Sequence, residues 1–112
     1  MKIIDWETLP ELGVSHDPNI KKKTLIGAGE IPKLMMFSTA IFKPGHSVET
    51  HKHDTMYEVF YIQKGKAIFE ISGQTHEANA GKCITIEPGE MHRQYNPFEE
   101  EVHWIYFGIA TD

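Results

Sequence analysis

Short runs of β-forming residues alternate with turn residues from Leu34 to the end of the chain, and no ten-residue window there carries apolar side chains at helical spacing. Strands at short, regular intervals are typical of an all-β sandwich or barrel, and the absent helical pattern argues against a βαβ architecture. The turns agree, because residues 63–65, 72–73 and 79–81 each place a residue that tolerates positive φ between two β-rich runs. The expected strands comprise residues 34–42, 47–53, 58–63, 66–71, 74–78, 83–86, 92–96 and 102–109.

The first 33 residues lack these regular β-forming runs. Prolines and glycines at short intervals separate brief apolar pieces such as Ile3-Ile4 and Leu25-Ile26, and this punctuation predicts irregular structure. With 112 residues, 40% of them hydrophobic, the chain has the size and composition of one globular domain rather than of a disordered segment. We therefore expect an N-terminal arm over residues 1–33, part of the same domain as a β-barrel over residues 34–112.

Acidic residues outnumber basic ones. Sixteen Asp and Glu against eleven Lys and Arg leave a net charge of -5, whereas nucleic-acid binding calls for a clustered basic surface. The one basic cluster is the triplet Lys21-Lys22-Lys23, which we expect to be a solvated patch on the arm. His16, also in the arm, is expected to be solvated as well. The charge pattern therefore predicts no nucleic-acid partner.

The sequence predicts a cytoplasmic protein. Cys83 is the sole cysteine, so the chain cannot form an internal disulfide, which fits a reducing compartment. Asp5 and Glu7 interrupt the apolar residues near the N-terminus, and no apolar run there has the length of a signal-peptide core or a membrane span. We expect no membrane partner.

The seven histidines include a pair at metal-ligand spacing. His51 and His53 are two residues apart in an expected strand, so both imidazoles leave the same face, about 6.6 Å apart along the strand. Glu58 opens the next β-rich run, and His92 begins another run after a Pro-Gly turn. If the barrel brings His92 opposite the others, three imidazoles and one carboxylate surround one metal ion and leave coordination positions open for water, oxygen or substrate.

The spacing of these residues resembles the first motif of the cupin superfamily, in which two glycines flank the ligands. The resemblance implies a small single-domain cupin, folded as a β jelly-roll barrel, also called a double-stranded β-helix. It also implies one divalent transition metal, either Fe, Mn, Ni, Cu or Zn, bound by His51, His53, Glu58 and His92. The five matching positions of the first motif are Gly45, His51, His53, Glu58 and Gly65.

A second stretch resembles the second cupin motif. Residues 92–96 are similar to its germin version, His-x-Gln-x-Asn. Strand alternation turns Gln94 to the same face as His92, so Gln94 either hydrogen-bonds a metal-bound water or is a polar residue at the barrel mouth. One position departs from the family, because Glu87 stands where proline is usual. The matching positions are Gly81, Gly89, His92 and Asn96.

Two further residues are candidates for proton transfer. Glu49 shares the parity of His51 and His53, and is either a general base in the pocket or an acid at the surface end of the strand. His103 is a pocket proton donor if the odd-numbered residues of 102–109 face inward, and a core or interface histidine otherwise. With Gln94, these residues form the candidate catalytic set.

We expect a metal-dependent enzyme that acts on a small oxygen-rich metabolite, as an oxygenase or other oxidoreductase. Isomerase, lyase or decarboxylase chemistry is the alternative, since an open metal site in a partly apolar cavity suits each of these reactions. The rival class is a non-catalytic cupin that binds or senses a sugar or organic acid. Phe60 and Ile62 share the parity of Glu58 and are expected to form an apolar wall.

The arm predicts a homodimer. Its apolar side chains belong to no expected element, so they need a surface to cover, and pairing across a two-fold axis supplies one. These side chains are Trp6, Leu9, Leu12, Val14, Leu25 and Ile26.

Overall fold

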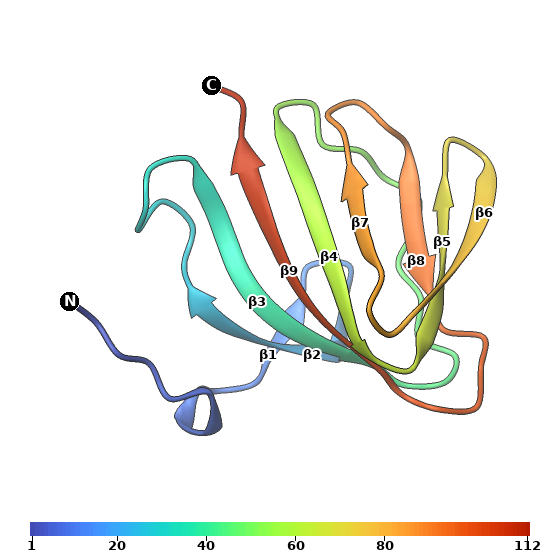
Figure 1. The fold of residues 1–112 in the computed structure, drawn as a ribbon, viewed down its shortest axis with the longest axis horizontal. Helices are drawn as coiled ribbons and strands as arrows, with labels where there is room; N and C mark the ends of the chain where they lie inside the picture. Colours follow the sequence, from blue (N-terminus) through green and yellow to red (C-terminus); the bar gives the residue numbers. More distant parts are fainter.

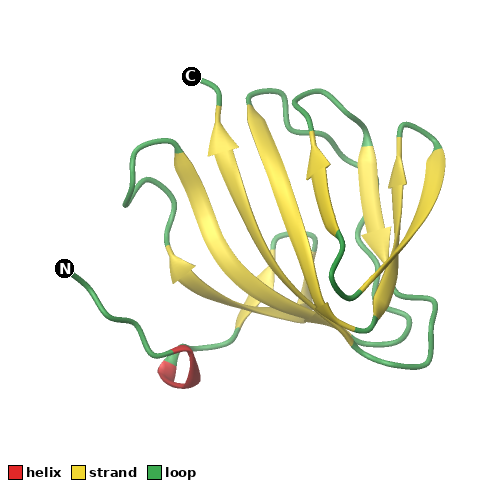
Figure 2. Cartoon of the chain, viewed as in Figure 1, coloured by secondary structure: helices red, strands yellow, loops and turns green.

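Antiparallel strands make up almost all the regular structure of the chain, and the computed structural model describes all of residues 1–112 (Figure 1 and Figure 2). The larger sheet has the strand order β1-β2-β3-β9-β4-β7, and the smaller has the order β6-β5-β8. The strands are β1 (Leu12–Val14), β2 (Asp17–Ile26), β3 (Leu34–Phe42), β4 (Met56–Lys64), β5 (Lys66–Ile71), β6 (Gln74–Asn79), β7 (Cys83–Ile86), β8 (His92–Tyr95) and β9 (Val102–Ala110).

The two sheets close around one apolar core. Alternate residues of β9, among them Trp104 and Tyr106, face inward and are buried. The indole of Trp104 contacts rings from both sheets, because its centroid lies 5.7 Å from that of Phe60 in β4 and 5.7 Å from that of Phe69 in β5. Buried aromatic rings at such distances gain from burial and from ring geometry. The expected all-β jelly-roll barrel is confirmed.

The irregular structure expected for residues 1–33 is wrong for residues 12–26, which form β1 and β2 at one edge of the larger sheet. Pro18 lies in β2, but pairing with β3 begins only at Lys21, so the proline removes no hydrogen bond from that ladder. Gly13 is needed where β1 lies close to β2, because a Cβ there would lie 2.7 Å from the Cα of Pro18. Gly13 and Pro18 therefore belong to a hairpin at the edge of the sheet rather than to an irregular arm.

The strand expected over residues 47–53 is also wrong. The segment makes only two isolated bridges with the β8 region, Ser47 with Tyr95 and His51 with His92. Reciprocal backbone hydrogen bonds of 2.9 and 2.8 Å join His51 and His92. The segment is thus an irregular strip that is pinned to β8 at the position of the two histidines. The other expected strands correspond to β3 through β9, with ends that differ by up to two residues.

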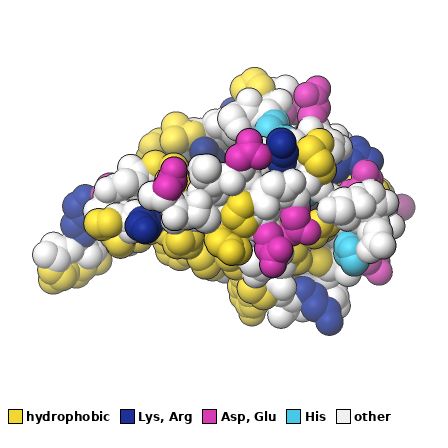
Figure 3. Space-filling view, turned by 90° about the horizontal axis from the view of Figure 1, so that it is seen from above, with side chains coloured by type: hydrophobic (Ala, Val, Ile, Leu, Met, Phe, Trp, Pro, Cys, Tyr) yellow, Lys and Arg dark blue, Asp and Glu magenta, His cyan; other side chains and the backbone are white.

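The residues before β1 lie outside the barrel and project from one end of the molecule (Figure 1 and Figure 3). Trp6 anchors them, since its indole N–H donates to the hydroxyl of Thr39 in β3 at 2.7 Å. Met1 and Ile3 are fully or mostly exposed. The only helical segment is the 3-10 turn Trp6–Thr8, and no helix has the length and apolar character to cross a membrane.

Candidate functional site

Three imidazoles and one carboxylate converge inside the barrel. His51 and His53 come from the irregular strip, Glu58 from β4 and His92 from β8, and their candidate ligand atoms all lie within 4.8 Å of one another. Oε1 of Glu58 lies 3.4 Å from Nε2 of His92 and 3.7 Å from Nε2 of His53. The fold therefore brings together the four residues that the sequence selected as metal ligands, and we call them the His/Glu cluster.

The backbone orients two of the imidazoles. Nδ1 of His51 donates to the carbonyl oxygen of Glu49 at 2.7 Å, and Nδ1 of His92 donates to that of Glu90 at 2.9 Å. With the proton on Nδ1, each ring keeps an Nε2 lone pair available as a ligand. Nε2 of His92 is buried and has no hydrogen-bond partner, although Glu58 approaches it. An unsatisfied buried nitrogen in such a donor set fits a divalent transition metal.

The environment shifts two of these imidazole pKa values in opposite directions. Burial lowers the pKa of His51, and the neighbouring imidazoles lower it further against the opposing hydrogen bond with Glu49. Burial also acts to lower the pKa of His92, but the interactions with Glu58 and with the Glu90 backbone outweigh it and raise that pKa. Since a ligating imidazole must be neutral, protons compete with a metal for His92.

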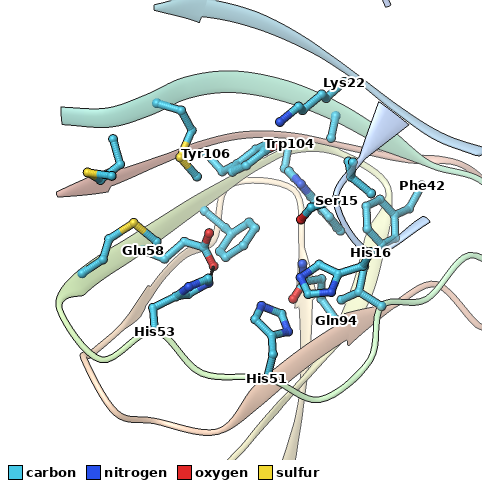
Figure 4. A pocket seen from close by; sticks show the side chains of 17 residues that line it. Ser15, His16, Lys22, Phe42, His51, His53, Glu58, Gln94, Trp104 and Tyr106 are labelled. Carbon is cyan, nitrogen blue, oxygen red and sulfur yellow. Dashed lines mark ion pairs between the residues drawn. The ribbon is translucent and has the colours of Figure 1, made fainter. Parts of the chain in front are cut away.

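A cavity of about 390 Å³ lies beside the His/Glu cluster (Figure 4). Its walls are mainly apolar and aromatic, with Phe42, Phe60 and Trp104 among the lining residues. The expected wall residue Phe60 is therefore in place, whereas Ile62 is buried without lining the cavity. A mostly apolar cavity with a few convergent polar groups is the usual form of a small-molecule site.

Gln94 is the candidate catalytic residue that the structure places in the cavity. Its side chain lines the cavity and is largely buried, and its Oε1 has no hydrogen-bond partner. Asn96, on the same face of the chain, is used differently: its Nδ2 donates to the carbonyl oxygens of Phe42 and Glu100 at 3.0 and 2.7 Å. The Gln94 amide thus remains available to a ligand, while the Asn96 amide joins the end of β3 to the loop before β9.

The other two catalytic candidates do not reach the cavity, and their expected roles there are corrected. The side chain of Glu49 is exposed and does not line the cavity, although its carbonyl oxygen orients His51. His103 lies on the outer face of β9, because the even-numbered residues of that strand face inward. Its Nε2 lies 3.6 Å from a carboxylate oxygen of Glu101 instead.

Three cavity residues were not expected from the sequence. His16, in the turn between β1 and β2, is exposed as expected, but it also lines the cavity. Burial lowers its pKa, and the charge of His51 adds to this effect. Tyr106 faces inward from β9, and burial together with Glu58 raises its pKa to about 12. Lys22 also lines the cavity. The parity of Tyr106 with Trp104 was a usable signal, but nothing local predicted His16.

One protein family and several known proteins are similar to this chain. The model of the cupin domain family matches residues 38–108. Dimethylsulfoniopropionate lyase DddW of Ruegeria pomeroyi is 36% identical over 112 residues, which covers 96% of this chain and 71% of that protein. The oxalate-binding protein of Thermotoga maritima is 29% identical over 73 residues, which covers 65% of this chain and 60% of that protein.

A solved structure shares the whole fold. The crystal structure of a predicted oxalate decarboxylase from Thermotoga maritima superposes with a TM-score of 0.89, covering 97% of this chain and 99% of that one. The two sequences are 21% identical, so this likeness concerns the fold alone.

Proposed function

The chain belongs to the cupin domain family, and on that premise we propose that it is a metal-dependent enzyme acting on a small oxygen-rich metabolite. The observation that carries the proposal is the His/Glu cluster beside a cavity of about 390 Å³ that has room for a small ligand. A purely structural ion has no need of such a space. The proposed metal ligands are His51, His53, Glu58 and His92.

In this proposal, the metal and the residues around it have separate roles in the reaction. A bound divalent ion supplies Lewis-acid chemistry at an oxygen of the substrate. The Gln94 amide orients the substrate or a water molecule through its unsatisfied Oε1. Tyr106, whose pKa is raised to about 12, stays protonated well above neutral pH and donates a hydrogen bond from its hydroxyl. The aromatic walls exclude bulk water, which strengthens these polar interactions.

Within this proposal, lyase or decarboxylase chemistry takes precedence over the oxygenase chemistry expected first. Support comes from the name of a similar protein, a dimethylsulfoniopropionate lyase that is 36% identical to this chain. Oxygenase chemistry predicts oxygen consumption when substrate is added, whereas the favoured reactions consume none. An oxygen electrode therefore separates the two classes.

A non-catalytic binding protein is the second candidate function. The observation in its favour is that Glu49 and His103, two of the three candidate catalytic residues, lie outside the cavity. The name of a similar protein, the oxalate-binding protein of Thermotoga maritima, also supports it. This candidate predicts that small organic acids or sugars bind the metal-loaded protein and are recovered unchanged.

The test compares His92→Gln with His76→Gln in protein purified without an affinity tag. His76 is an exposed histidine of β6 that belongs neither to the cluster nor to the cavity lining, so its variant controls for the loss of one imidazole. We expect about one divalent metal per chain in the wild type and in His76→Gln, and loss of stoichiometric metal in His92→Gln. Full metal content in His92→Gln, or none in the wild type, contradicts the proposal. A screen of small acids and sugars then separates enzyme from binder.

We further propose a cytoplasmic homodimer. The outer face of the larger sheet presents exposed apolar side chains, including Tyr57, Tyr61 and Ile109, and the residues before β1 project beyond the barrel (Figure 1). A second copy that covers this face removes apolar surface from water. The exposed Cys83 thiol suits a reducing compartment. A strictly monomeric mass by light scattering at micromolar concentration rejects the dimer.

A further inference from the structure

The three consecutive lysines of β2 are not equivalent. Lys21 and Lys23 pair with Ile41 and Thr39 of β3 and face outward, where their ammonium groups bind backbone carbonyl oxygens at 2.8 and 3.2 Å. Lys22 pairs with the buried Ala40 and therefore faces into the barrel. The expectation of a solvated triplet is thus wrong for its central member.

The ammonium group of Lys22 has no partner within the protein. Lys22 is half-buried and lines the cavity, yet its ammonium group forms no ion pair or hydrogen bond, unlike those of Lys21 and Lys23. The only carboxylate that lines the same cavity is Glu58, which already approaches His53 and His92. A counter-charge stabilises a cation in a mostly apolar cavity, and an anionic ligand in the cavity would supply one.

Lys22 and the His/Glu cluster approach the cavity from different sides. In Figure 4 the Lys22 side chain enters beside β3, whereas His51 and His53 enter from the strip opposite, with Trp104 and Tyr106 between them. A ligand that fills the cavity therefore meets the cluster at one end and an ammonium group at the other. An ammonium group is a compact donor that recognises carboxylate oxygens.

We infer that Lys22 binds a carboxylate of the substrate and so restricts the substrate to small organic acids. The inference rests on the proposed function for the other end of the ligand, where an oxygen donor reaches the metal held by the His/Glu cluster. Sugars lack the anionic group that Lys22 requires. The substrate class is thus a small acid that carries a carboxylate at one end and a second oxygen function at the other.

The test uses metal-loaded protein and isothermal titration calorimetry with oxalate, malonate, succinate and glutarate. The tightest of these acids is then compared with its diamide, in which neither end is charged. We expect Lys22→Met to bind that acid about tenfold or more weakly than the wild type, as for a lost hydrogen bond to a charged group. Lys21→Met, the matched outward control, should bind it within about twofold of the wild type.

The diamide distinguishes recognition of charge from a structural effect. We expect the wild type and Lys22→Met to bind it with similar affinity, because it has no carboxylate for Lys22 to bind. Equal binding of the acid by the wild type and Lys22→Met overturns the inference, and so does an equal loss for the acid and its diamide. Failure of all four acids to bind the wild type also overturns it.

Metal content, measured on the same samples, separates this inference from the proposed function. Protein that takes up no metal, but still binds an acid in a manner that depends on Lys22, contradicts the proposed function and leaves the inference standing. Protein that takes up metal, but binds acids equally well with or without Lys22, contradicts the inference alone.

Discussion

The imidazole of His16 lies against that of His51, with ring centroids 4.2 Å apart and planes tilted by 37°. This contact places the turn between β1 and β2 directly over one edge of the His/Glu cluster. It also brings a fourth imidazole next to three others, where a further positive charge is unfavourable. The edge hairpin therefore forms part of the site as well as part of the sheet.

In metal-free protein, we expect His16 to titrate below its ordinary pKa of 6.5, because of burial first and the charge of His51 second. A lowered imidazole pKa means that the folded state favours the neutral form. The corresponding stability is present above the unfolded-state pKa and is lost as the pH falls through the folded-state value. His51→Gln removes the second cause, so the pKa of His16 should rise part of the way towards 6.5.

Histidine ring-proton NMR over a pH series measures this pKa. His76→Gln is the control, because His76 lies exposed in β6 and its loss should leave the titration of His16 unchanged. A His16 pKa at or above 6.5 in the metal-free protein contradicts the described stacking.

Gln94→Ala should keep the metal and lose function. Gln94 lines the cavity but does not belong to the His/Glu cluster, so metal content should stay near that of the wild type. Turnover or ligand binding should fall about tenfold or more, as for other partners that surround a metal site. Asn96→Ala is the contrasting variant on the same face: it loses three hydrogen bonds, two donated by Nδ2 and one accepted by Oδ1, and should cost about 3 kcal/mol of folding stability.

Elemental analysis and calorimetry measure these effects for Gln94→Ala, and urea unfolding measures the stability of Asn96→Ala. If Gln94→Ala loses its metal together with its activity, the amide supports the cluster itself rather than a ligand.

The sequence was sufficient to predict the strands that alternate clearly and the four residues of the His/Glu cluster. The positions of the ligands follow from local geometry. His51 and His53 lie on one irregular strip, and a pair of backbone hydrogen bonds joins that strip to His92. This local geometry survives even though residues 47–53 do not form the expected strand. The cluster was therefore predictable from the motif without a correct strand assignment.

The facing of β9 and β2 could not be read from the sequence. Both faces of β9 carry apolar residues, with Trp104 and Tyr106 on one side and Ile105 and Phe107 on the other, so hydrophobicity did not say which side faces inward. That ambiguity misplaced His103. In β2, the charged side chain of Lys22 points inward, although polar residues of a strand usually face solvent. Its direction is set by the pairing of β2 with β3, which the sequence does not show.

Tyr106 should ionise only at strongly alkaline pH. Burial, with the charge of Glu58, raises its pKa from 10.0 to about 12. The stability linked to this shift is fully present below pH 10 and is lost as the pH rises through about 12. Tyr106→Phe lacks this loss, so above pH 10 its unfolding free energy in metal-free protein should fall by about 2 kcal/mol less than that of the wild type.

The tyrosinate absorbance of the wild type minus that of Tyr106→Phe isolates this one phenol, and urea unfolding across the same pH range gives the stability. A difference spectrum that titrates near pH 10 contradicts the burial of Tyr106 beside Glu58.

Gly65→Ala should destabilise the fold more than Gly73→Ala, although both glycines have positive φ, +77° and +80°. Gly73 has open space around it, so alanine there meets only the backbone cost of the left-handed region, about 1 kcal/mol. At Gly65, between β4 and β5, a Cβ would overlap the carbonyl oxygen of Glu101 and crowd the Cα of Val102 at the start of β9. We therefore expect a cost of about 3 kcal/mol there, because the close backbone contact adds to the same strain. Urea unfolding midpoints at constant m-value measure both costs, and equal costs would show that β9 does not pack against this turn as described.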